Sequence, residues 1–163
     1  MPSTDAKHLK RWIKASFVRL VRPMLEQGVD LFVEGEDRLT NKSRKFMELR
    51  IDGPYTKPCG TAGEFRSYVE INLLGTSTRD EANVYDRENL QGLLAFILNR
   101  DFCVYRTGNE DQLPDIDDNT MFGTMLLIPH DEIKTSDFGQ IDPNTEVYQC
   151  VCEAHFEMYH GDT

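Results

Sequence analysis

The sequence predicts an α+β fold: a single domain, mainly an antiparallel sheet, with an N-terminal helix and a second helix packed on one face. Three observations predict this class. The chain opens with an amphipathic helical pattern, several strand-like runs follow, and a second helical pattern interrupts those runs. A length of 163 residues suits one compact domain, and no linker divides the chain, so we expect the domain to span 1–163.

The first element is an amphipathic helix in the opening segment. We expect Ser3 or Thr4 to cap its N-terminus, Pro23 to kink or end it one turn early, and Gly28 to stop it. Basic residues occupy its other sides, which are either solvated or docked on an acidic partner surface. The apolar residues follow the three-four spacing of one helix face: Leu9, Trp12, Ile13, Phe17, Leu20, Val21 and Met24.

Three strand-like runs follow this helix, over 30–36, 45–52 and 64–74. The second run alternates, with Met47 and Leu49 on the same face. The Gly and Pro residues between the second and third runs indicate turns rather than a phosphate-binding loop.

The second half begins with a helix predicted over 79–99, followed by a short strand at 102–106. An apolar run at 121–129 and a closing strand at 146–159 complete the pattern, whereas about 108–144 has the character of an acidic insertion. Apolar positions of these elements should be largely buried: Trp12, Phe17, Leu20, Leu49, Ile71, Leu94, Ile97, Cys152 and Phe156.

The charge is acidic overall and unevenly distributed. The formal net charge is −10, which argues against electrostatic binding of nucleic acid by the whole surface. Residues 1–50 hold 11 Lys and Arg against 7 Asp and Glu, whereas residues 51–163 hold 7 against 21. Either the particle is dipolar, or the elements of the two parts interleave and the asymmetry disappears in space. No apolar run approaches the ~20 residues of a membrane span.

The four cysteines, Cys59, Cys103, Cys150 and Cys152, lack the paired spacing of a zinc site. No export signal is present at the N-terminus, so we predict reduced thiols in a cytosolic protein.

Three patterns bear on catalysis or metal binding, and none predicts either. The segment Asp115–Asn119 begins like a calcium loop, but the required Gly and Glu are replaced by Thr120 and Leu126. Cys103 and His130 form a pair only if the fold brings them together.

Glu153, His155 and Glu157 share one face of the closing strand, as a metal or acid–base cluster would. Alternation on an exposed strand produces the same pattern, and the sequence identifies no ligand from another element. We therefore expect no catalytic residue, no metal ligand and no cofactor, and predict that the protein is not an enzyme.

The order of elements resembles that of the tail terminator, or tail-to-head joining, proteins of long-tailed bacteriophages. The features that resemble the family are the opening helix LKRWIKASFVRLVRPML, the strand EFRSYVEINLLGTS, the helix ENLQGLLAFILNR and the closing strand EVYQCVCEAHFEMY. In that family a helix precedes a run of strands, a second helix packs on the same sheet, and a final strand ends the chain. The segment 108–144 is longer than the family's usual connection.

The resemblance implies a structural virion protein of the tail or neck, assembled in the host cytoplasm. Such a protein forms a homo-oligomeric ring, commonly hexameric, on the last ring of the tail tube protein, ends tube polymerisation and meets the head-tail connector or neck protein. Genomic DNA passes through the ring without specific binding. Our interface candidates come from two polar loops and from Lys45, which follows the first of them: Arg38, Lys42, Arg44, Lys45, Glu110, Asp111, Asp115, Asp117 and Asp118.

Other functions stay open on the sequence alone. The nearest is another neck, tail-completion or connector protein. Two alternatives remain. One is a cytosolic adaptor that binds a partner through the basic helix, and the other is a small metal-dependent enzyme that uses the strand face of His155.

Overall fold

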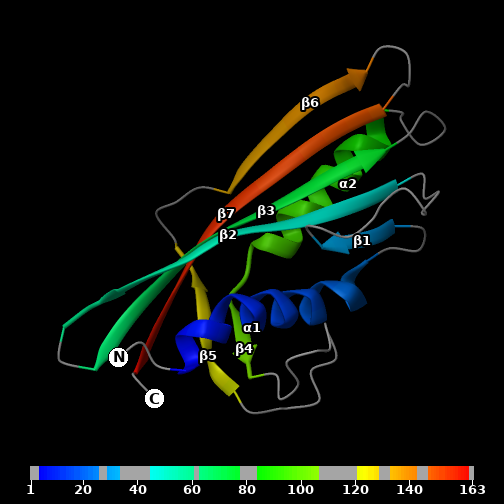
Figure 1. Ribbon diagram of the computed structural model, residues 1–163. Helices are drawn as coiled ribbons and strands as arrows, with labels where there is room; N and C mark the ends of the chain where they lie inside the picture. Colours follow the sequence, from blue (N-terminus) through cyan, green and yellow to red (C-terminus); the bar gives the residue numbers. More distant parts are fainter. Residues whose placement is uncertain are drawn as a thin grey trace.

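The computed structural model describes residues 4–25, 29–33, 45–60, 63–77, 84–106, 121–128, 133–142 and 147–161. They form a single domain in which a curled, mostly antiparallel sheet of seven strands has both helices on one face (Figure 1). The predicted α+β fold with an N-terminal helix is confirmed. Neither described helix combines the length and the apolar character that crossing a bilayer requires.

Both predicted helices are present. Helix α1 (Thr4–Val21) passes into a short 3₁₀ turn, η1 (Arg22–Met24), and α2 covers Val84–Leu98. The regular part of α1 ends two residues before Pro23, as predicted, because proline lacks the amide hydrogen that the helix needs. Ser3 and Gly28, the expected helix limits, lie outside the described residues.

The strands occupy most of the rest of the described chain. They are β1 (Val29–Val33), β2 (Lys45–Pro58), β3 (Glu64–Ser77), β4 (Phe102–Tyr105), β5 (Met121–Leu127), β6 (Lys134–Asp142) and β7 (Val147–Gly161).

The sheet order is β1-β2-β3-β7-β5-β4, and β6 also pairs with β7. The long strand β7 has β6 beside its first half, whereas β5 pairs with it farther along, at Phe156 and Glu157. Three details differ from the sequence prediction. Strand β2 continues over 53–58, where turns were expected. Strand β1 pairs with β2 in parallel, and the polar stretch over 130–145 contains β6. An edge strand needs few apolar residues, so β6 left no clear hydrophobic pattern.

The core lies between the helices and one face of the sheet. Side chains of β2, β3 and β7 form rows there, such as Leu49, Leu73 and Cys152, and both helices pack over these rows. All the residues expected in the core are buried except Leu20, which is half-buried. Leu20 lies one residue before the end of α1 and borders an open groove, so its side chain is only partly covered.

Strands β2, β3 and β7 continue past the helices as a three-stranded arm, visible at the lower left of Figure 1. A bulge begins the arm at Gly53, whose φ of +101° suits glycine. Tyr55 and Tyr159 are each 58% exposed on this arm. The hydrogen bond from Tyr55 to the Asp52 carboxylate raises the pKa of the Tyr55 hydroxyl.

Candidate functional site

The most concentrated polar chemistry among the described residues surrounds His155, on the outer face of the sheet. We use "outer face" for the side of β2, β3 and β7 that points away from the helices. The strand register places Glu70 of β3 opposite His155 of β7, and Glu153 is two residues before His155. His155 Nε2 lies 3.0 Å from Glu153 Oε1 and 3.8 Å from Glu70 Oε2. We call Glu70, Glu153 and His155 the His155 cluster.

Two neighbours on β3 orient this cluster. The hydroxyl of Tyr68 forms a hydrogen bond with Nδ1 of His155, the ring nitrogen that points away from the carboxylates. The side-chain amide of Asn72 donates to Glu70 Oε1 over 2.9 Å, so the other oxygen of Glu70 is the one nearest to His155. The three side chains of the cluster are 19–29% exposed, so solvent reaches them.

Glu157 shares the outer face with Glu153 and His155, as the alternation predicts, but it has a different partner. Its carboxylate forms a hydrogen-bonded ion pair with Arg66 of β3. This contact raises the pKa of the Arg66 guanidinium. The third member of the cluster is therefore Glu70, which the sequence did not indicate, because only the register of β3 on β7 brings Glu70 to His155.

A second histidine takes part in a pair that outwardly suits nucleophilic catalysis. Ser67 Oγ lies 2.7 Å from His160 Nε2 and 2.7 Å from Thr56 Oγ1. Ser67, however, is fully buried, and the His160 ring packs against Phe65 and Phe122. A substrate has no route to this hydroxyl, so we assign the pair to packing at the base of the arm.

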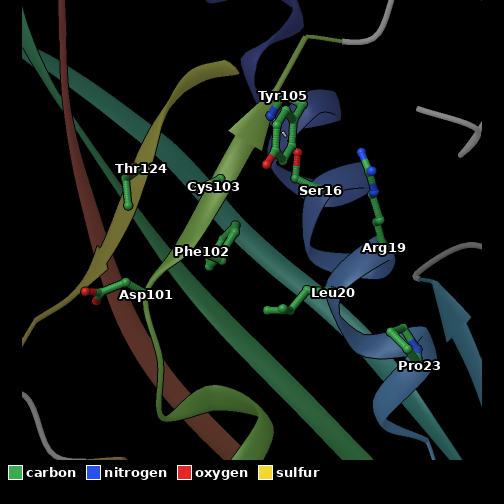
Figure 2. A pocket seen from close by; sticks show the side chains of 9 residues that line it. All are labelled: Ser16, Arg19, Leu20, Pro23, Asp101, Phe102, Cys103, Tyr105 and Thr124. Atoms are coloured by element: carbon green, nitrogen blue, oxygen red, sulfur yellow. Dashed lines mark hydrogen bonds between the residues drawn. The ribbon is translucent and has the colours of Figure 1, made fainter. Parts of the chain in front are cut away.

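The described chain also has an open groove of about 510 Å³ between α1 and the edge strand β4 (Figure 2). Ser16 accepts a hydrogen bond from the backbone N–H of Tyr105 over 2.9 Å, and the guanidinium of Arg19 lies 5.3 Å from the centre of the Tyr105 ring. Cys103 also lines the groove, but the residues that line it include no histidine. His130, its suggested partner, lies outside the described residues. The groove therefore has the polar contacts of a helix–strand junction.

The charge asymmetry of the sequence persists in space among the described residues. Lys10, Arg19 and Arg22 are exposed on α1 and η1, in the helical layer. On the outer face, on the opposite side of the sheet, the carboxylates outnumber the arginines Arg50 and Arg66: they are Glu48, Asp52, Glu70, Glu153 and Glu157. Among the described residues, the helical layer and the outer face therefore differ in charge. This arrangement agrees with the dipolar alternative and not with the one in which the asymmetry disappears in space.

Of the interface candidates, only Lys45 falls within the described residues. It is the first residue of β2, half-buried, and opposite Val29 of the edge strand β1. The remaining candidates lie outside the described residues: Arg38, Lys42, Arg44, Glu110, Asp111, Asp115, Asp117 and Asp118. The four cysteines are free thiols.

Neither a protein-family model nor a curated protein sequence matches this chain.

Proposed function

We propose that the protein is a ring-forming virion component that ends the tail tube of a long-tailed bacteriophage and joins it to the neck. The observation that favours this function is the pair of sheet edges on opposite sides of one subunit. Across the half of the sheet that contains β6, the order is β1-β2-β3-β7-β6, so β1 and β6 are its outermost described strands (Figure 1). Two different edges suit head-to-tail assembly, which closes into a ring when the rotation allows.

The strand directions fit such a junction. Strand β1 is parallel to β2, and each step from β2 through β3 and β7 to β6 is antiparallel, so β1 and β6 run in opposite directions. A rotation about a ring axis preserves each strand's sense along that axis. Pairing of β6 with the β1 of the next copy would then be antiparallel and would extend the sheet around the ring.

The test uses two phenylalanines of nearly equal exposure. Phe138 on edge strand β6 is 59% exposed, and Phe96 on α2 is 61% exposed. Light scattering after size exclusion, with electron microscopy of the particles, should show a ring for the wild type at high concentration. Phe138→Lys should leave monomers, because an added charge on an edge opposes strand pairing. The matched variant Phe96→Lys should retain the ring.

The tail role is tested by adding the ring to growing tail tubes. A terminator at amounts well below those of the tube protein should shorten the tubes, with rings at one tube end. A chain that stays monomeric at all concentrations would contradict ring assembly. A ring that binds a connector and leaves tube growth unchanged would instead favour the related role of a neck or connector protein.

A further inference from the structure

We propose that Glu70, Glu153 and His155 bind one divalent transition-metal ion, with Zn²⁺ as the best fit to these donors. The inference is independent of the ring and tail functions, since it rests only on side chains of β3 and β7 within one subunit. The sequence supplied three potential ligands on one strand, Glu153, His155 and Glu157, and no ligand from another element. The pairing of β3 with β7 supplies that ligand in Glu70.

The spacing of the donor atoms matches a tetrahedral metal site. Ligand atoms about 2.1 Å from a tetrahedral Zn²⁺ are separated from one another by about 3.4 Å. The distances from His155 Nε2 to the two carboxylates, 3.0 and 3.8 Å, lie on either side of that value, and the three donor atoms all lie within 4.8 Å of one another. Small side-chain rotations would therefore bring all three to bonding distance, with the fourth position left to water.

The hydrogen bonds behind the donors are those of a metal site. A ligating histidine binds the ion through one ring nitrogen and donates the other N–H to a neighbouring acceptor, which fixes the ring. Tyr68 occupies that second position at Nδ1, while Nε2 faces the carboxylates. Asn72 plays the same part for Glu70, since it holds Oε1 and leaves Oε2 toward the histidine.

The charge of the surroundings also favours a cation. Arg66 pairs with Glu157 and Arg50 pairs with Glu48, so these two arginines of the outer face are engaged by carboxylates outside the cluster. Asp52 lies opposite Glu70 on β2 and adds a further negative charge. One imidazole and two carboxylates suit Zn²⁺ better than Mg²⁺, which prefers six oxygen ligands in an octahedron.

Isothermal titration of the untagged full chain with ZnCl₂ tests this site. The titration uses a Cys59→Ser/Cys103→Ser background, because these two half-buried thiols would compete for zinc. We expect one ion per chain, and binding of Mg²⁺ that is at least tenfold weaker. Tyr68→Phe should lower the affinity for Zn²⁺ by about 10–100-fold, the usual effect of losing a group that orients a ligand. Glu70→Gln and Glu153→Gln should lower it at least as much.

Glu157→Gln is the matched control, because it makes the same substitution on the same face of β7 at a carboxylate already paired with Arg66. It should bind Zn²⁺ as the parent does. Thermal melts without metal show whether each variant folds, and added Zn²⁺ should raise the melting temperature of the parent and of Glu157→Gln more than that of the other variants. Equal Zn²⁺ affinity in the parent and Glu70→Gln would overturn the proposal. So would a loss in Glu157→Gln as large as that in Glu70→Gln, since that result indicates general attraction to an acidic surface.

Discussion

The Cys152 thiol lies in the middle of the core, where Leu73 of β3 is its cross-strand neighbour and the backbone carbonyl of Gln91 on α2 accepts from it over 3.7 Å. Burial disfavours the thiolate and, with a contribution from Cys150, raises the pKa of Cys152 from 9.0 to about 12. The residue is therefore a small apolar core side chain with little nucleophilic character, in keeping with the use that the sequence predicted for it.

This shift predicts a pH-dependent loss of stability. The unfolded thiol releases its proton near pH 9, whereas the folded thiol keeps it until about pH 12, so the folded state binds more protons between these values. The Cys152 contribution to the free energy of unfolding should thus be complete below pH 9 and should fall as the pH rises from 9 toward 12. Urea unfolding at a series of pH values checks this, and Cys152→Ala should have a shallower dependence than the parent. A slope unchanged in Cys152→Ala but reduced in Cys59→Ala would contradict the assignment.

Among the elements, those with a strong apolar period were predictable from the sequence. The two helices and the strands β2, β3 and β7 lie close to their expected positions, because each buries one continuous apolar face. Strand β6 was not predicted, since its hydrogen bonds to β7 determine its structure and its exposed residues, such as Thr135 and Ser136, follow no apolar alternation. The register between strands could not be predicted from the sequence either. Glu70 lies beside His155 only because of the register of β3 on β7.

The bulge of β2 allows a test at the scale of one element. A Cβ atom at Gly53 would lie 2.8 Å from the backbone oxygen of Tyr68, and the φ of +101° is strained for any other residue. Gly53→Ala should therefore lower the free energy of unfolding by the ~1–3 kcal/mol of backbone strain together with the cost of the clash. Gly63 has a φ of +90° and open space around it, so Gly63→Ala should show the strain alone. Chemical denaturation measures both, and equal losses in the two variants would argue against the contact with Tyr68.

At the scale of the whole molecule, the sequence established that the two parts of the chain differ in charge but not where those charges lie. The order of the strands decides this, because β2, β3 and β7 turn their carboxylates to the outer face while α1 turns its basic side to solvent in the opposite layer. Residues such as Asp52 and Glu157 are far apart in sequence, so no local pattern could place them on a common surface.

If the chain assembles into the proposed ring, this separation predicts which surface lines its channel. Double-stranded DNA must pass through a terminator without being held, and each neutralised phosphate adds salt-dependent attraction. We therefore expect the acidic outer face to line the channel and the basic side of α1 to face protein neighbours. Asp52→Lys/Asn72→Lys adds three positive charges per subunit to the outer face, and Glu88→Lys/Asn89→Lys makes the same types of change at exposed positions of α2.

The two variants should differ in how they bind linear and closed circular DNA of equal length, since only a free end can enter a preformed ring. For Asp52→Lys/Asn72→Lys, the affinity for linear DNA should rise and should decline steeply with added salt, while the affinity for circular DNA stays low. For Glu88→Lys/Asn89→Lys, any gain should be equal for the two forms, because its charges lie outside the channel. Filter binding measures both affinities. A preference for linear DNA in the α2 variant, and none in the outer-face variant, would place the helical layer in the channel and reverse the proposed orientation of the subunit.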